Sequence, residues 1–391
     1  MIEALIDPLL AQLSPVVWGG ALAVVSLGLS AVAIRRDRPL DWRFALPVEH
    51  PADGPPLFET VFDHRPAEGQ AHSPAIAVKD DGFTLVWFEG SAEAQADVDI
   101  HHARFSRDAG GGWHHDTPAP LITRRALSAC FEPRQAVITL GNTIQNEIAP
   151  DAFYATVVSV GGWAMASVAD VRIDPDRRVP VRAHKLNLSP LLNRSHLVKS
   201  PMVAYADGSH GLPAYFEMKH GYSELVRLDA EGRVRDVRRI PEGRNAIQPM
   251  IVPLDERHAI AFLRNFGTGS RRLLVSETAD GGRHWSAVHD SDLPNPDAPV
   301  AALALGGDRI LMALNDDAQR SDLLRLLLSQ DRGRSWRRIA TLEDGGGDAD
   351  RAVRYPMLRR LRDGSIVLAY SQRGKHGIRA HVFNDAWVNA Q

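Results

Sequence analysis

Residues 329–336 read Ser-Gln-Asp-Arg-Gly-Arg-Ser-Trp, an octapeptide of the form Ser/Thr-x-Asp-x-Gly-x-x-Trp. The same form recurs at 106–113 and, with Thr in its first position, at 278–285. In such a segment the Asp and hydroxyl side chains can bond neighbouring backbone donors in a tight hairpin, while the glycine permits positive φ and the Trp packs beneath the turn. The residues that we therefore expect to be structural rather than catalytic are Asp108, Asp280, Asp331, Trp113, Trp285 and Trp336.

Short runs with strand character fill the chain around these repeats. Examples at 83–88, 259–263 and 365–370 are bounded by Asp, Gly, Asn or Pro, as β-strands are. Asp331 follows Asp280 by 51 residues, about the length of one four-stranded propeller blade. Long helical periodicity is confined to the N-terminus, so the pattern favours an all-β propeller over an α/β fold.

The composition narrows the functional classes. The chain has 391 residues, 44% of them hydrophobic, which is enough for a large packed core. Nucleic-acid-binding domains usually carry a strong excess of positive charge, and the formal net charge of −3 gives no sign of one. The single cysteine, Cys130, excludes an intrachain disulfide and a cysteine-based zinc site. No metal-binding or phosphate-binding motif occurs, so we expect neither a metal nor a cofactor.

An apolar stretch near the N-terminus predicts a membrane-spanning helix. Residues 8–34 contain no charged side chain, and about 20 apolar residues suffice to cross the hydrocarbon core. Trp18 lies near one end, and arginines at 35, 36 and 38 close the other. A cleaved signal peptide fits less well, because the residues before this stretch include Glu3 and Asp7 and no Lys or Arg. We expect an uncleaved anchor.

The three octapeptides resemble the Asp-boxes of the sialidase (neuraminidase) superfamily, in particular bacterial exo-α-sialidase-like proteins with BNR repeats. The resemblance covers roughly residues 65–388 and includes the segments 82–87, 140–142, 247–249, 293–296 and 355–356. It implies a six-bladed β-propeller preceded by a transmembrane helix, and a glycan or acidic sugar as substrate. The implied division is an anchor at 1–38, a Pro-rich polar linker at 39–60 and the propeller at 61–391.

Sialidases share three arginines that clamp the substrate carboxylate, a tyrosine nucleophile, a glutamate beside it and an aspartate acid/base. Tyr355 matches the tyrosine, since it precedes a late strand that ends at Tyr370. Arg264, just upstream of an Asp-box, resembles the second arginine. Arg320, 35 residues before Tyr355, resembles the third.

The other parts depart from the family pattern. His72, in His-Ser-Pro, stands at the position of the first arginine. Asp97, 25 residues later, is the expected acid/base, with Glu93 and Asp99 as rivals. Gln248 stands where the glutamate should be, 16 residues before Arg264, and an amide is no base. The alternative carboxylate for this role is Glu217.

Three functions remain open on this basis. The first is an exo-glycosidase that removes a terminal acidic sugar. In it Arg264, Arg320 and His72 hold the carboxylate, Tyr355 attacks and Asp97 donates the proton. The second is a non-catalytic propeller that binds a glycan or a membrane-protein partner. The third is a uronate polysaccharide lyase, in which His72 or Tyr355 abstracts a proton.

The flanking charges and the implied function disagree about orientation. The positive-inside rule would place the arginines after the apolar stretch in the cytoplasm. A sugar-processing domain is more useful outside, and we expect a single-pass protein with a periplasmic or extracytoplasmic propeller.

Overall fold

The computed structural model describes residues 15–36, 39–48, 50, 54–189, 193–243, 245–267 and 269–391. The chain divides into a unit that ends at Asp41 and a second unit that begins at Trp42. Each unit is described by itself.

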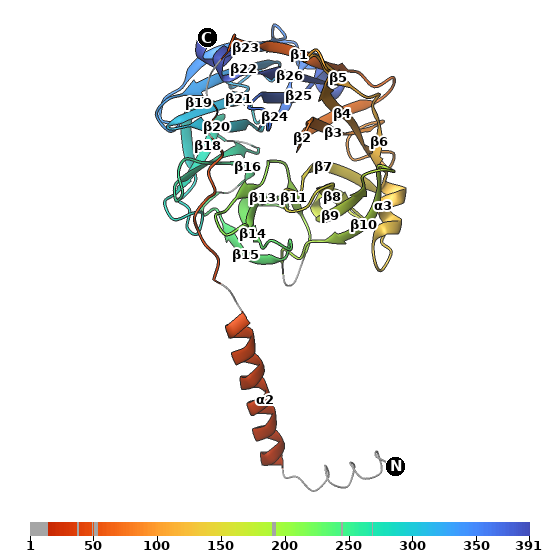
Figure 1. Cartoon of the computed structure of the whole chain (residues 1–391), viewed down its shortest axis with the longest axis vertical. Coiled ribbons are helices and arrows are strands. Elements are labelled where there is room, and N and C mark those ends of the chain that lie inside the picture. The colour runs from red at the N-terminus through yellow and green to blue at the C-terminus, as the bar shows by residue number, and fades with distance from the viewer. Residues whose placement is uncertain are drawn as a thin grey trace. The chain divides into compact units, whose positions relative to one another are not determined.

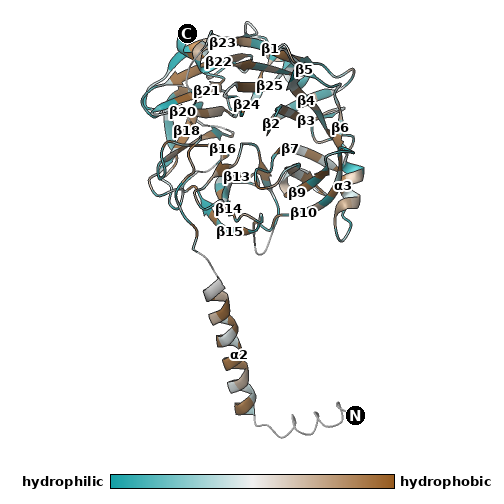
Figure 2. Cartoon of the chain, viewed as in Figure 1, coloured by the Kyte–Doolittle hydropathy of each residue, from teal (hydrophilic) through white to brown (hydrophobic). Residues whose placement is uncertain are grey.

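Helix α2 (Pro15–Arg36) is the described element of the first unit. Residues Pro15–Ile34 have a mean hydropathy of 2.0, and Figure 2 shows apolar residues along the helix. Twenty residues at 1.5 Å each match the thickness of the hydrocarbon core, so the helix is long and apolar enough for a membrane anchor or a signal sequence. Glu3, Asp7 and Arg38, which entered the membrane prediction, lie outside the described residues.

The second unit is a six-bladed β-propeller, as the sequence predicts: six antiparallel sheets surround a common centre (Figure 1). From the inner strand outward, blade 1 contains β2 (Gln70–Lys79), β3 (Gly82–Gly90), β4 (Asp99–Arg107) and β5 (Trp113–His115), and β6 (Ala119–Ile122) also pairs with β4. Blade 2 contains β7 (Thr139–Gln145), β8 (Ala152–Val158), β9 (Ala166–Asp174) and β10 (Val179–Lys185). Blade 3 contains β11 (His196–Val198) and β12 (Val203–Ala204), which both pair with β13 (His210–Phe216), followed by β14 (Tyr222–Leu228) and β15 (Val234–Arg239).

The second half of the ring follows the same plan. Blade 4 contains β16 (Ala246–Pro253), β17 (Ala259–Asn265), β18 (Arg272–Thr278) and β19 (His289–Pro294); blade 5 contains β20 (Ala301–Gly306), β21 (Arg309–Leu314), β22 (Leu323–Ser329) and β23 (Arg337–Asp344); blade 6 contains β24 (Arg354–Arg360), β25 (Ile366–Gln372), β26 (Gly377–Phe383) and β1 (Phe58–His64). Short helices are α3 (Arg124–Cys130), α4 (Asp385–Ala390), η1 (Trp163–Met165), η2 (Ala349–Arg351) and η3 (Arg373–Lys375).

The ring closes without a covalent link. Strand β1, from the start of the propeller, pairs antiparallel with β26 near the end of the chain and completes blade 6. The Phe58 ring stacks on Phe383 and contacts Trp387 of α4, with ring centroids 5.8 and 4.6 Å away. This closure gives blade 6 its outer strand and covers the edge of β26.

The Asp-box segments form the turns between the third and fourth strands of blades 1, 4 and 5. Asp108 Oδ1 accepts hydrogen bonds from the backbone N–H groups of Gly110 (2.9 Å) and Gly112 (2.8 Å). Asp331 Oδ1 accepts one from Ser335 N at 2.8 Å. Neighbouring strands are antiparallel, so these turns lie at the end of the propeller opposite to the start of each inner strand.

Two further turns use the same hydrogen bonds without the tryptophan. In blade 2, Asp174 Oδ1 accepts from Asp176 N and Arg177 N at 3.0 and 2.9 Å. In blade 3, Asp229 Oδ1 accepts from Glu231 N and Arg233 N at 3.1 and 2.9 Å. The sequence pattern missed these turns because neither segment has its Ser/Thr, Gly or Trp in position, whereas the Asp alone supplies the acceptor for the turn.

The segment that begins the second unit packs on this same end of the propeller. Phe44 N donates to Glu256 O at 2.7 Å, and Ala45 N donates to Ala204 O at 2.9 Å. The Phe44 ring lies 4.9 Å from that of Tyr205. Residues 42–48, which the sequence assigns to a linker, therefore include contacts with blades 3 and 4.

A buried lysine ties three blades together. Lys199, at the inner edge of blade 3, is 3% exposed. Its Nζ donates to Val300 O, which leads into blade 5, at 2.8 Å, and to Pro356 O in blade 6 at 2.7 Å. Burial lowers the pKa of this amine from its usual value near 10.5 to about 7.

Replacing Lys199 by Met leaves both carbonyls without this donor, so we expect the free energy of unfolding to fall by about 2 kcal/mol. In the wild type, the unfolded chain binds more protons at Lys199 than the folded chain between about pH 7 and 10.5, so this group makes stability rise with pH in that window. The loss in Lys199→Met should thus be larger at about pH 9 than at about pH 6.5. Urea unfolding of the full chain in detergent, followed by Trp fluorescence, measures both effects. The exposed Lys219→Met is the matched control, and an equal loss in the two variants would contradict the role of Lys199.

Candidate functional site

A bulge recurs near the start of the inner strands. The register shifts between His72 and Ala75 in β2, and the corresponding shifts in β7, β16 and β24 fall at 140–143, 247–250 and 354–357. Bulges re-aim side chains, and here they do so at one end of the propeller in four blades.

Three of these bulges place a residue before proline in the left-handed region. Ser73, Gln248 and Tyr355 have φ of 54°, 53° and 56°. A residue before proline prefers extended backbone, and positive φ is costly for a bulky side chain. Such strain is retained where the surrounding structure imposes it, and it marks these three positions as candidates for function.

The Tyr355 hydroxyl lies among polar groups from blade 4. Gln248 Nε2 donates to Tyr355 Oη at 3.1 Å. Arg264 Nη1 donates to Gln248 Oε1 at 3.2 Å and lies 3.5 Å from Tyr355 Oη. Arg264 Nε donates to the Asp297 carboxylate at 2.7 Å. The structure thus brings together Tyr355, Arg264 and Gln248, which the sequence places in one site.

The network continues around the ring. Gln248 Nε2 and Asn142 Nδ2 each lie 3.4 Å from the hydroxyl of Tyr215 in blade 3. Asn142 Oδ1 accepts a hydrogen bond from Ser73 Oγ of blade 1 at 2.6 Å. Residues from blades 1, 2, 3, 4 and 6 therefore share one connected set of hydrogen bonds.

His72 is a buried neutral group beside the tyrosine. It is 1% exposed, and its ring centroid lies 4.5 Å from that of Tyr355. Neither ring nitrogen has a hydrogen-bond partner among the described residues. Burial holds the pKa of His72 well below its usual value, and the positive charges of Lys375, Arg354 and Arg264 lower it further.

These three cations mark the centre as electropositive. Lys375 pairs with Glu93, and Arg354 Nη1 donates to the backbone oxygen of Asp297 at 3.4 Å. Sequence reasoning missed Arg354 and Lys375. Arg354 directly precedes Tyr355 at the start of an inner strand, which is the signal that could have indicated it. Lys375 lies in η3, beyond the second strand of the blade, and only the fold brings it here.

A small pocket opens beside Tyr355. Its lining comes from blades 1 to 4 and 6: Phe88, Glu93, Gly141, Asn142, Trp163, Leu197, Tyr215, Glu217, Gln248 and Tyr355. The lining combines two carboxyl groups and two phenols with an apolar wall. Burial raises the pKa of Glu217, an effect that Arg264 opposes and Glu93 reinforces. Its volume of about 30 Å³ has room for a group the size of a water molecule, so a bound sugar would extend beyond it.

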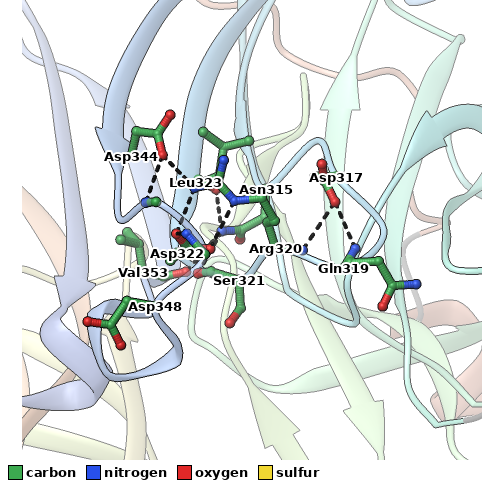
Figure 3. A network of polar contacts seen from close by, with 12 residues as sticks. Asn315, Asp317, Gln319, Arg320, Ser321, Asp322, Leu323, Asp344, Asp348 and Val353 are labelled. Carbon is green, nitrogen blue, oxygen red and sulfur yellow. Dashed lines mark hydrogen bonds and ion pairs between the residues drawn. The ribbon is translucent and has the colours of Figure 1, made fainter.

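Arg320 and Asp97 lie outside this pocket lining. Figure 3 shows Arg320 in the loop between β21 and β22, where its guanidinium pairs with Asp322 at 2.7 Å and with Asp344. Asp97 is exposed, and its carboxylate accepts hydrogen bonds from Ser91 N at 3.0 Å and Ser91 Oγ at 2.9 Å. Both side chains already have local partners.

A larger cavity, of about 740 Å³, lies at the other end of β2, between blades 1 and 2. Lys79 on its wall pairs with Asp151 at 2.6 Å, and Arg104 pairs with Asp81 at 2.6 Å. Size alone does not make a site. The strained Tyr355 lines the small central pocket, and the three cations lie near enough to the adjacent His72 to lower its pKa. Within the described part of the chain, no group of three or more His, Cys, Asp or Glu residues could hold a metal ion.

Comparisons with known proteins agree with the fold. The chain matches the BNR repeat-like domain over residues 81–368. No curated protein sequence matches it. Similar solved structures include a Hadza microbial sialidase (TM-score 0.60, 14% identity, 82% of this chain and 66% of that one) and Trypanosoma rangeli sialidase (0.57, 12%, 83% and 56%). A Dyadobacter fermentans protein of unknown function has a TM-score of 0.61 at 13% identity, over 83% of this chain and 98% of that one. At these identities the likeness concerns the fold.

The electrostatics of His72 can be measured directly. We expect its imidazole to stay neutral at about pH 6, where an exposed histidine is substantially protonated, because burial and the three cations lower its pKa. Lys375→Met removes one cation and should raise the pKa of His72. The measurement is an NMR titration of the full chain in detergent with ¹³Cε1-labelled histidine, assigned by the peak lost in His72→Gln. Lys219→Met is the control, and an ordinary titration of His72 would contradict the burial argument.

Proposed function

The chain belongs to the BNR repeat-like domain family, and on that premise we propose that it is an exo-acting glycoside hydrolase of the sialidase type that removes a terminal acidic sugar. The observation that carries the proposal is the position of the Tyr355 hydroxyl. It lies at the centre of the propeller, 3.5 Å from the Arg264 guanidinium and on the wall of a pocket with two carboxyl groups.

Tyr355 is proposed as the nucleophile. The guanidinium of Arg264 lies 3.5 Å from Tyr355 Oη, where it would stabilise negative charge that develops near this oxygen during the reaction. The positive φ of Tyr355 and the bond from Gln248 fix the direction of the hydroxyl. This support is local and independent of the resemblance to known enzymes.

The substrate carboxylate is assigned to Arg264, Arg354 and Lys375. A guanidinium matches a carboxylate with two parallel hydrogen bonds, and Arg354 Nη1 donates to a backbone carbonyl, that of Asp297, at 3.4 Å. His72, predicted as a clamp residue, is neutral here and would offer a ring N–H to an oxygen of the sugar. Arg320 is left out because, unlike these three cations, it is not among the charges that lower the pKa of His72 at the centre.

The proposed location is a membrane surface. Helix α2 would be retained as a single-pass anchor, with the propeller on the periplasmic or extracytoplasmic side, where glycans are found. A glycan is the proposed partner of the pocket, and a membrane protein is a possible partner of an anchored propeller. Labelling of the propeller from outside intact cells, but not after deletion of residues 1–38, would support this topology.

One observation favours a second function, a non-catalytic glycan-binding propeller. The nearest polar neighbour of Tyr355 Oη is the Gln248 amide at 3.1 Å, and an amide cannot accept the phenolic proton as a base. The uronate lyase alternative is not carried forward, because the lowered pKa of His72 makes it a poor base.

Replacing Tyr355 by Phe removes the proposed nucleophile and keeps the ring. We expect hydrolysis of an aryl α-sialoside by the full chain in detergent to fall at least about 10³-fold, which exceeds the loss of one hydrogen bond. The measurement is release of the fluorogenic aglycone.

Tyr154→Phe is the matched control. The Tyr154 hydroxyl is buried in blade 2 and has no hydrogen-bond partner among the described residues, so its loss should leave the rate unchanged. Wild-type turnover that persists in Tyr355→Phe would reject the nucleophile. No turnover in any variant, together with glycan binding that survives in Tyr355→Phe, would establish the binding function instead.

A further inference from the structure

Two carboxyl groups on the pocket wall have different surroundings. Glu93, in the loop after β3, forms an ion pair with Lys375. Glu217 directly follows β13, and its carboxyl group has no hydrogen-bond or ion-pair partner among the described residues, although its backbone N–H donates to Ser195 O at 3.1 Å. One carboxyl therefore has a cationic partner, and the other is left open to the pocket.

The surroundings of Glu217 favour its protonated form. The side chain is half-buried beside the Tyr215 ring, on the same pocket wall as Phe88 and Leu197. The charged groups that face it are Arg264, which favours ionisation, and Glu93, which opposes it. Burial is the largest effect and raises the pKa of the carboxyl, and Glu217 in turn raises the pKa of Tyr215. A carboxyl whose surroundings favour its protonated form, on the wall of a pocket, is a candidate general acid.

We propose that Glu217 is the proton donor of the glycosidase reaction, in place of Asp97. The proposal rests on the proposed function. Glu217 lines the pocket that contains Tyr355, whereas the Asp97 carboxylate is exposed and held by two hydrogen bonds from Ser91. A group that gives its proton to the departing oxygen must lie near the sugar, and Glu217 shares the wall of one small pocket with the proposed nucleophile.

The steps balance as follows. Tyr355, after loss of its proton to water, forms a bond from Oη to the anomeric carbon while the glycosidic C–O bond breaks, and the departing oxygen takes the proton of Glu217. Water then attacks the anomeric carbon, the bond to Tyr355 Oη breaks, and the Glu217 carboxylate takes a proton from that water. No oxidant, metal or further reactant is needed, and Glu93, paired with Lys375, takes no part in these steps.

The test compares two leaving groups in the full chain in detergent. A 4-methylumbelliferyl α-sialoside releases a stable phenolate, so its departing oxygen needs little protonation. The departing oxygen of sialyllactose would leave as an unstable sugar alkoxide unless an acid protonates it. For Glu217→Gln we expect kcat/KM on sialyllactose to fall by about 10²–10⁴, the range for loss of a general acid, and on the aryl sialoside by under about tenfold. In the wild type the rate on sialyllactose should decline as pH rises through the pKa of Glu217, and the variant should lack this decline.

Two further variants separate the possible causes. Glu231→Gln, at an exposed position that pairs with Arg233, should behave as wild type on both substrates. Glu93→Gln should lower both rates by a similar factor, because it alters the cation cluster and not proton transfer. Equal losses on both substrates in Glu217→Gln, or a leaving-group-dependent loss in Asp97→Asn instead, would overturn the assignment and leave the proposed hydrolase intact. A wild-type chain that cleaves neither substrate would reject the hydrolase and this assignment with it.

Discussion

The pairing of β1 with β26 is the contact on which the rest of the propeller depends. A blade is a small twisted sheet that buries its apolar faces only against the two neighbouring blades, so the ring must close for every blade to be covered. Closure here joins residues more than 300 positions apart through strand hydrogen bonds and the aromatic packing of Phe58. No disulfide contributes, since the chain has a single cysteine. Lys199 adds polar bonds between blades 3, 5 and 6 near the centre.

Once the ring is closed, the bulges of the inner strands create the site. Ser73, Gln248 and Tyr355 have a positive φ, which their residue types disfavour. Each also precedes a proline, and this makes any conformation other than extended less favourable still. The strain aims their side chains into one hydrogen-bonded set at one end of the propeller, while the Asp-box turns occupy the other end. Turns that stabilise the fold and residues that could act on a ligand are thus separated by the direction of the strands.

The charge arrangement at the centre differs from the pattern that the sequence resemblance implies. A neutral His72 stands where that pattern has an arginine, and an amide stands where it has a carboxylate. Blade 6 contributes two cations, Arg354 and Lys375, that lie near enough to depress the pKa of His72. Cationic side chains are therefore present near His72, but two of them come from blade 6. Glu93 forms an ion pair with Lys375. Glu217, on the same pocket wall, has no such partner among the described residues.

The sequence by itself determined the repeat, the strand content and the apolar helix, because each of these follows from local patterns of residues. The six blades and the grouping of Tyr355, Arg264, Gln248 and His72 were implied by the family resemblance that the repeats carry, and the structure brings these four residues together. Only the tertiary structure decided the partners of the charged side chains. Arg320 stands where the resemblance implies a clamp residue, but its guanidinium pairs with two carboxylates of its own blade, one of them 24 residues away. Such pairs depend on distances between strands, and no local pattern encodes these distances.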